Sequence, residues 1–304
     1  MTAIDLFAGL GGWTLAAGMC GLQVLWAANH SPLAVQFHSA NNPLTHHVCQ
    51  DLHQAQWTSV PDHDVMLAAP SCTGHTNAKG KDGPQYDEAR STAWAVISAL
   101  ECKRPALCLV ENVPRFRKWV LYPAWTAAVQ ALGYAISECL LDAADVGVPQ
   151  HRVRLFLVLT RSVAPLTLRI ERQAHVPVAD VIGWDDYAWS PVYRPGRAQS
   201  TIARFHHGRS NFGQRFVFPY YKSGSGQQGR SLARPLGTIT TRARWAVCDG
   251  DRMRMFQPAE LARAMSFPSA YTLPRKADQA IHLLGNAVPP LMGAAVLRAA
   301  LEAV

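Results

Sequence analysis

The first half of the chain alternates short apolar runs with segments of helical periodicity, and this order restricts the possible folds more than any other feature. Five runs have the length and composition of buried strands: Ala3–Phe7, Gln23–Ala28, Val65–Ala69, Ala106–Val110 and Val153–Thr160. Four helices are predicted between these runs: Trp13–Cys20, Leu33–Ala40, Tyr86–Lys103 and Tyr122–Leu132. A weaker strand, His46–Cys49, is predicted after the second helix. Alternation of this kind is typical of an α/β domain with a mostly parallel sheet covered by helices on both faces.

A glycine-rich turn, Phe7-Ala8-Gly9-Leu10-Gly11-Gly12, follows the first strand. Glycine lets the backbone approach a bound ligand closely, so the turn is a candidate cofactor site. A plain tight turn would have the same composition. Dinucleotide sites usually add an acidic residue about 20 positions on, which holds a ribose. The corresponding residue here is Asn29, which bonds a hydroxyl without charge.

Cys72 and Glu111 each follow one of the apolar strands. Ligands bind at the carboxyl ends of the strands in open α/β sheets, so both side chains are expected at one ligand-binding edge. A thiolate nucleophile beside a positioned acid suits covalent catalysis. The alternatives are a buried cysteine that packs as a small apolar residue and a surface or helix-capping glutamate. The polar stretch Thr73–Pro84 after Cys72 is predicted to be a mobile lid.

Arg152 and Arg154 alternate with apolar residues at the start of the last predicted strand. Side chains two positions apart in a strand share a face, so both are expected on the same side. We interpret them as two cations at the mouth of the ligand cleft, where they would hold a carbonyl or phosphate group. Two charges on an edge strand are the alternative.

The chain changes character after Thr160. Residues 187–248 hold ten basic residues, interleaved with aromatic ones, and no acidic residue. Solvated surfaces usually mix charges of both signs, so this segment predicts a nucleic-acid-binding surface. The net charge of +8 arises there, because the rest of the chain is close to neutral.

Other features exclude other classes of protein. Seven cysteines without regular spacing argue against a disulfide framework. No second pair of ligands joins Cys72 and His75, so no metal site is expected. The uncharged stretch Leu6–Ala28 has the length of a membrane span, but its five glycines and the preceding Asp5 indicate a buried strand–turn–helix–strand unit. The protein is therefore expected in the cytoplasm, without membrane contact.

Six segments, in this order, resemble the motifs of the DNA cytosine-C5 methyltransferase family. They are Asp5–Gly12, Pro70-Ser71-Cys72, Glu111-Asn112-Val113, Gly147–Arg154, Pro235–Thr241 with Glu260–Pro268, and Gly285–Pro290. The resemblance covers nearly the whole chain. It implies a Rossmann-like S-adenosylmethionine-dependent methyltransferase domain at 1–160 plus 276–304. It also implies a smaller, loop-rich, mainly β target-recognition domain at 161–275.

The resemblance further implies transfer of a methyl group from S-adenosylmethionine to C5 of a cytosine flipped out of double-stranded DNA. The catalytic residues would be Cys72, which adds to C6, and Glu111, which donates to N3, assisted by Arg152 and Arg154. The cofactor-binding residues would be Asp5, Phe7, Ala8, Gly9, Gly11, Gly12, Asn29, His30, Asp51, Leu52, Pro70, Asn286, Ala287 and Val288. The DNA-binding residues would be Thr73, Gly74, His75, Arg204, Arg209, Arg215, Lys222, Arg230 and Arg242. A prokaryotic or phage-encoded monomer, from a restriction–modification system or a phage, is the implied setting.

The sequence departs from the family pattern at two places. Ser71 and Thr73 flank the nucleophile where the family usually has Pro and Gln. Asn29 and Ser31 stand where the family usually has Glu and Asp. The loss of both carboxylates predicts a looser grip on S-adenosylmethionine, or tolerance of a cofactor variant that bears a negative group.

Three alternatives remain open at this point. RNA would be the substrate if the chain resembled the branch of the family that methylates a tRNA, although the large basic segment favours DNA. A catalytically silent DNA-binding homologue would explain Asn29 and Ser31, but not the intact Cys72 and Glu111. A nicotinamide-dependent dehydrogenase would explain the glycine-rich turn, and nothing downstream supports it.

Overall fold

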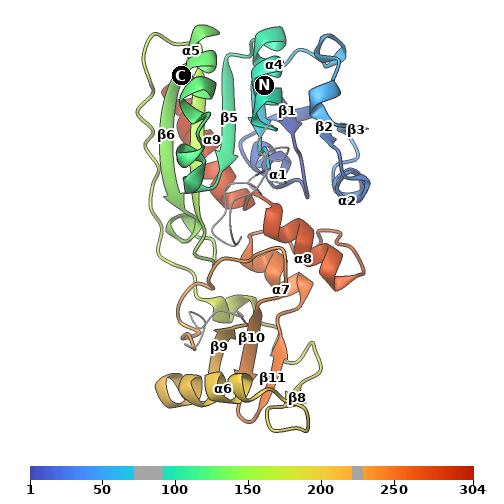
Figure 1. Cartoon of the computed structure of the whole chain (residues 1–304), viewed down its shortest axis with the longest axis vertical. Coiled ribbons are helices and arrows are strands. Elements are labelled where there is room, and N and C mark those ends of the chain that lie inside the picture. The colour runs from blue at the N-terminus through green and yellow to red at the C-terminus, as the bar shows by residue number, and fades with distance from the viewer. Residues whose placement is uncertain (72–91, 221–228) are drawn as a thin grey trace. The chain divides into compact units, whose positions relative to one another are not determined.

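The computed structural model describes residues 1–71, 92–220 and 229–304. The chain forms two compact units (Figure 1). The first comprises Met1–Val146, Val153–Arg172 and Ala287–Val304, and the second comprises Gly147–Arg152 and Gln173–Asn286. The segments 147–152 and 276–286 thus belong to the second unit, whereas the sequence placed them in the catalytic domain.

A seven-stranded sheet in the order β3-β2-β1-β4-β5-β7-β6 forms the centre of the first unit. The strands are β1 (Thr2–Leu6), β2 (Gln23–Asn29), β3 (His46–Cys49), β4 (Val65–Ala68), β5 (Leu107–Asn112), β6 (Ala135–Asp142) and β7 (Val153–Thr160). Strands β3, β2, β1, β4 and β5 pair in parallel with one another. Strand β7 pairs in the antiparallel sense with both β5 and β6. This confirms the predicted α/β class with a mostly parallel sheet.

Helices cover both faces of this sheet (Figure 1). They are α1 (Gly12–Met19), α2 (Pro32–Asn41), α4 (Ala93–Lys103), α5 (Tyr122–Ala131) and α9 (Pro290–Ala303). Ile4 and Leu6 pack into a core with α4 and α5, whereas Asp5 points to the opposite face, where it contacts α1. The alternation of side chains along β1 therefore separates an apolar face from the face that carries the polar residues discussed below.

Two elements differ from the sequence prediction. Strand β6 was not predicted, because its residues alternate between buried and exposed and include Glu138 and Cys139. The predicted helix Tyr86–Lys103 is present as α4 from Ala93; residues 86–91 lie outside the described part of the chain. Short 3-10 turns complete the unit: η1 (Leu52–Gln54), η2 (Trp57–Ser59), η4 (Pro114–Lys118) and η5 (Ala143–Val146).

The second unit contains a four-stranded antiparallel sheet in the order β8-β11-β10-β9. Its elements are η6 (Val178–Val181), β8 (Ser190–Pro191), α6 (Gln199–Phe212), β9 (Arg215–Pro219), β10 (Trp245–Asp249), β11 (Arg252–Met255), α7 (Pro258–Ala264) and α8 (Ala277–Asn286). Helix α6 contributes Phe205 to a core with Phe216 and Phe218 of β9. The sequence predicted a loop-rich, mainly β unit but not the 14-residue helix α6.

Among the described residues, the helical stretch Ala277–Ala303 has the length and the apolar composition of a membrane-spanning helix. Asn286 ends α8 and Pro290 begins α9 within it. Because 78% of its most apolar window is buried inside the protein, we read it as two core helices.

Candidate active site

The glycine-rich turn connects β1 to α1, and backbone hydrogen bonds to β2 and within the turn hold it in place. The Ala8 amide donates to the Ala28 carbonyl at 3.0 Å, and the Gly11 amide donates to the Ala8 carbonyl at 2.8 Å. Phe7, Gly9 and Gly11 have positive φ angles of 60°, 44° and 95°. This left-handed backbone favours glycine and is costly for Phe7, so the turn holds a strained residue at the edge of the sheet.

Gly12 is required for a different reason, which is contact with the last motif. A Cβ atom on Gly12 would lie 1.9 Å from the carbonyl oxygen of Val288. The predicted cofactor residues Ala287 and Val288 are thus brought against the turn, from the opposite end of the chain. Asn286 belongs to the second unit, where its side-chain amide lies 3.3 Å from Nε2 of His282.

Asn29 and Ser31, at the end of β2, form the N-terminal cap of α2. The Ser31 amide donates to Oδ1 of Asn29 at 2.9 Å, and Oγ of Ser31 accepts from the Ala34 amide at 3.4 Å. Oδ1 of Asn29 thus accepts one hydrogen bond, and its Nδ2 group can donate to a ligand. His30 between them is exposed. An uncharged amide, with a donor as well as an acceptor, stands at the end of β2.

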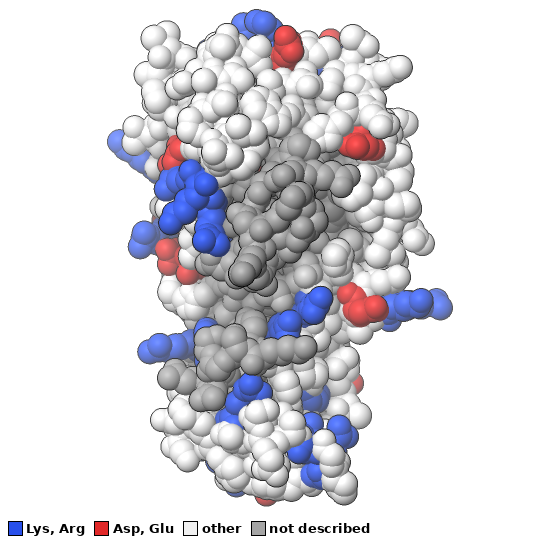
Figure 2. Space-filling model, in the orientation of Figure 1, with Lys and Arg blue, Asp and Glu red and all other residues white. Residues whose placement is uncertain are grey.

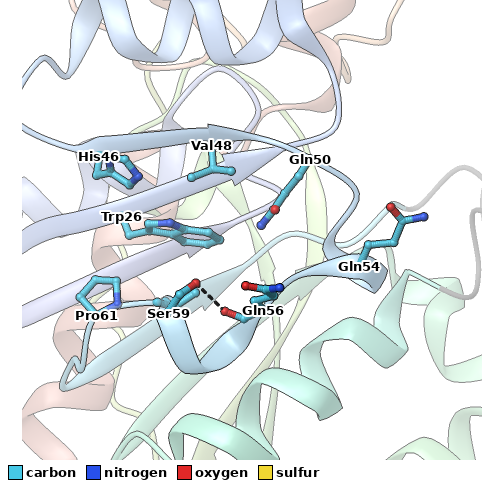
Figure 3. Close-up of a pocket in the computed structure, with 9 residues that line it drawn as sticks. Trp26, His46, Val48, Gln50, Gln54, Gln56, Ser59 and Pro61 are labelled. Atoms are coloured by element: carbon cyan, nitrogen blue, oxygen red, sulfur yellow. Dashed lines mark hydrogen bonds between the residues drawn. The ribbon is translucent and has the colours of Figure 1, made fainter.

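Asp51 and Leu52 follow β3. Oδ1 of Asp51 accepts from the His53 amide at 3.0 Å and caps η1, while Leu52 is buried in the core. Gln50 and Gln54 on either side of them line a pocket of β2, β3 and the η1–η2 segment, in which Trp26 lies between His46 and Ser59 (Figure 3). The lining side chains include amides, a hydroxyl and an imidazole, but no carboxylate, Lys or Arg.

The ends of β4 and β5 meet, as predicted. Nδ2 of Asn112 donates to the Pro70 carbonyl at 3.2 Å, and the Ser71 amide donates to Oγ1 of Thr92 at 3.1 Å. Asn112 thus holds the residue two positions before the predicted nucleophile. Cys72, Thr73, Gly74 and His75, with the rest of the predicted lid, lie outside the described residues.

Glu111, one residue before Asn112, forms an ion pair with Arg154 of β7. Nε of Arg154 lies 2.9 Å from Oε1 of Glu111, and the two side chains are only 12% and 9% exposed. Strands β5 and β7 bring them together because Asn112 pairs with Leu155 in the antiparallel register. An ion pair with so little exposure fixes the position of the Glu111 carboxyl group.

Arg152 is engaged elsewhere, so the structure does not bring the two arginines to one group. Its guanidinium is buried and donates to the carbonyls of Ile239 at 3.0 Å and Gly285 at 2.9 Å, all within the second unit. Gln150 has a similar role there, since its Oε1 accepts from the Ile239 amide at 2.8 Å. The contacts of Arg152 among the described residues therefore join the loop at Ile239 to the C-terminal turn of α8.

The predicted DNA-binding residues of the second unit fall into three groups. Arg209 pairs with Asp251, and Arg215 pairs with Asp249 at 2.8 Å. Arg230 lies over the ring of Trp245 and Arg204 over that of Tyr220, at 5.2 and 5.8 Å. Arg242 is exposed, and Lys222 lies outside the described residues. The acids that pair with Arg209 and Arg215 stand just beyond the acid-free segment, so that two of the predicted cations are partly neutralised.

Basic side chains lie at several places on the visible face of the second unit, and acidic ones at few (Figure 2). Among residues 1–71, 92–220 and 229–304, no group of three or more metal-ligating side chains gathers. The candidate site therefore consists of the glycine-rich turn, the end of β2 and the Pro70–Asn112 and Glu111–Arg154 contacts.

The sequence profile of the C-5 cytosine-specific DNA methylases matches residues 1–302. The chain belongs to this family. Membership makes it an enzyme of the class that methylates C5 of cytosine in DNA. One relative of this methylase, the type II methyltransferase M.NlaX of Neisseria lactamica, is 28% identical over 326 residues, which cover 99% of the chain and 97% of M.NlaX. The type II methyltransferase M.HhaI of Haemophilus parahaemolyticus is 24% identical, with 94% and 89% covered.

Solved structures of similar fold cover the whole length of this methylase. A mutant of Spodoptera frugiperda DNMT2 superimposes with a TM-score of 0.74 at 18% identity, over 99% of both chains. The Entamoeba histolytica methyltransferase EhMeth superimposes with a TM-score of 0.71 at 14% identity, over 99% of this chain and 98% of its own. These likenesses establish the Rossmann-like methyltransferase fold.

Two features of the methylase were missed by sequence reasoning. The first is a buried, bidentate ion pair, in which both terminal guanidinium nitrogens of Arg254 donate to the carboxylate oxygens of Glu260 at 2.7 Å. The Gly183 carbonyl accepts from Arg254, and the Gly183 amide donates to Glu260. The capping-box pattern Gln257–Glu260 could have predicted that Glu260 caps the start of α7. Nothing in that pattern indicates that Arg254 is its ion-pair partner. The second is a chain of polar side chains beneath the glycine-rich turn, described below.

Proposed function

We propose that this methylase transfers the methyl group of S-adenosylmethionine to C5 of a cytosine in double-stranded DNA, through a transient bond between Cys72 and C6. The observation that carries the proposal is the joining of the β4 and β5 ends, where Asn112 binds Pro70 and Arg154 holds Glu111. These contacts support the proposal, because Asn112, the neighbour of Glu111, binds the segment that leads into Cys72.

Features of the first unit support S-adenosylmethionine as the methyl donor. The turn from Phe7 to Gly12 has no room for a side chain at Gly12, and a positive φ at Gly9. Asp51 has a carboxylate oxygen beyond the one that caps η1, which would accept from an adenine amino group. When bound, S-adenosylmethionine supplies an electrophilic methyl group. The donor face of Asn29 favours, as a second form of the proposal, a cofactor variant with an added negative group.

The chemistry follows from the residues of the chain. Cytosine C5 is a poor nucleophile until a thiolate adds to C6, which breaks the aromatic system and gives C5 enamine character. Cys72 would supply the thiolate. Glu111 would donate a proton to N3 as negative charge develops on the ring, with Arg154 keeping the carboxyl group in place. After methylation, loss of the C5 proton allows Cys72 to leave as thiolate.

DNA recognition is assigned to the second unit and base flipping to the region of Cys72. A base inside a duplex is out of reach of Cys72, so the cytosine must leave the helix at a cost of a few kcal/mol. Arg242, which is exposed, and Arg204 and Arg230, which lie over aromatic rings, would contact phosphates or guanines. A cytoplasmic location fits this substrate.

The test is methylation of duplex DNA with labelled S-adenosylmethionine, followed by digestion to nucleosides. Wild type should form 5-methylcytosine, and Cys72→Ala should form none. Cys102→Ala is the matched control, because Cys102 is an exposed thiol on α4 and should leave activity unchanged. DNA with fluorine at C5 cannot lose a C5 proton, so wild type should remain covalently attached to it. Activity that survives in Cys72→Ala would refute the mechanism, and binding without transfer would indicate a silent DNA-binding protein.

A further inference from the structure

A chain of four polar side chains crosses the first unit beneath the glycine-rich turn. Oγ1 of Thr14 donates to Oδ2 of Asp5 at 2.8 Å and lies 3.0 Å from Nε2 of His38. Nδ1 of His38 lies 2.7 Å from Nε2 of His47. These residues come from β1, α1, α2 and β3, and both histidines line a narrow cavity with Ala8, Gly9 and Asn29.

The hydrogen-bond donors along this chain can be assigned. Thr14 has one hydroxyl proton and gives it to Asp5, so at His38 the threonine oxygen must accept, and Nε2 of His38 carries a proton. The backbone of Thr45 hydrogen-bonds the ring of His47 and raises its pKa, as a carbonyl that accepts a ring proton does. The His47 nitrogen that faces His38 is then bare when the ring is neutral, so Nδ1 of His38 must also carry a proton.

The charges agree with this assignment. Asp5 is fully buried, and its second carboxylate oxygen, Oδ1, accepts no hydrogen bond from the described residues. A buried carboxylate with one hydrogen bond requires a positive charge nearby. Nε2 of His38 lies 3.8 Å from Asp5. Burial, and then the positive charge of His38, lower the pKa of His47, which keeps that ring neutral. Exposed His46 is a further titratable group near His38 and His47. Helix α1 and strand β2, which pack against these two rings, present uncharged residues to them: Thr14 from α1 and Ala27 from β2.

We infer that His38 is the protonated counter-ion of Asp5, with His47 as its neutral acceptor, and that this ion pair makes His38 a positioning residue for the cofactor turn. Asp5 precedes the turn and Thr14 follows it, so the bridge between them ties the two ends of the turn together. The inference rests on the proposed function for the identity of the cofactor, S-adenosylmethionine, but the protonation of His38 does not depend on it.

Nitrogen NMR of the full-length protein with labelled histidine tests the protonation directly. Both ring nitrogens of His38 should be protonated at neutral pH, and His47 should be neutral with its proton on Nδ1. Asp5→Asn should lower the pH at which His38 loses its second proton. A His38 ring that is neutral at neutral pH would overturn the inference.

A double-mutant cycle with Asp5→Asn and His38→Gln tests the positioning role. Calorimetry should show that His38→Gln weakens S-adenosylmethionine binding about tenfold, within the usual range for coupled sites. Wild-type affinity should fall at high pH as His38 deprotonates, whereas the affinity of His38→Gln should lack that step. The double variant should regain part of the lost affinity and of the urea midpoint, because no unpaired charge stays buried.

His207→Gln is the matched control, since His207 is exposed on α6 of the second unit; it should bind S-adenosylmethionine as wild type does. A double variant no better than His38→Gln would overturn the positioning role. If the wild type binds no S-adenosylmethionine, the proposed function fails, while the NMR result and the urea midpoints still decide the ion pair.

Discussion

Two glycine-to-alanine changes in α1 should alter stability in opposite directions. Alanine at Gly12 would bring its Cβ to 1.9 Å from the Val288 carbonyl oxygen, whereas real contacts of this kind do not fall below 3.0 Å. The backbone of the turn or of Val288 must therefore shift by more than an ångström. Overpacking of this kind costs about 1–3 kcal/mol. Gly18, in the same helix, has no atom within 4 Å of its added Cβ, so Gly18→Ala should stabilise by about 0.5–1 kcal/mol.

Urea unfolding followed by circular dichroism measures both effects, and calorimetry measures binding of S-adenosylmethionine. We expect Gly12→Ala to unfold at lower urea and to bind more weakly, and Gly18→Ala to unfold at higher urea with unchanged binding. Equal stability of Gly12→Ala and wild type, with equal binding, would show that the turn and the last motif do not depend on this contact.

Four further predictions follow from the contacts of the two units. Glu260→Gln should lower the free energy of unfolding by about 3–5 kcal/mol, because it leaves Arg254 buried without a counter-ion; the matched change Asp249→Asn breaks partly exposed pairs with Arg215 and Arg252 and should cost about 1 kcal/mol or less in the same urea assay. Asn29→Glu should tighten binding of S-adenosylmethionine about tenfold by calorimetry, the equivalent of about 1.4 kcal/mol, and unchanged affinity would contradict the role given to the Asn29 donor. Arg154→Gln should lower the methylation rate, because the Glu111 carboxyl group loses the guanidinium that holds it in place; an unchanged rate would argue against this. Burial lowers the pKa of His63, so its neutral form stabilises the fold above about pH 6.5 and this contribution is lost as pH falls towards the lowered pKa; His63→Gln should flatten the fall in urea midpoint over that range.

The first unit could be predicted because most of its strands are continuous apolar runs. Strands β4 and β5 are buried on both faces, so all residues from Val65 to Ala68 and from Leu107 to Val110 are apolar. Strand β6 lies at the sheet edge, and Ser137 and exposed Glu138 interrupt its apolar residues, so no such run marks it. Helix α6 was missed because Gly208 and the polar residues around it weaken the helical pattern, although Gly208 is needed for contact with Phe216.

The site was predictable to the level of strand ends but not of individual contacts. The adjacency of Pro70 and Asn112 follows from parallel pairing of β4 and β5. The burial of Arg152 against the carbonyls of Ile239 and Gly285 does not, because both residues lie far away in the sequence. The pairing of Arg215 with Asp249 was hidden for a similar reason, since only the antiparallel register of β9 and β10 brings them together.

The closure of Val288 onto Gly12 has a consequence for any attempt to shorten the protein. The wall of the glycine-rich turn comes from a segment far along the sequence, and helix α9, which continues from it, packs against α1. A variant cut before Ala287 would keep β1, the turn and α1, but would lose the atoms that close the turn on this side. Removal of residues 287–304 should therefore expose the face of α1 that α9 covers, even though every strand of the seven-stranded sheet is retained.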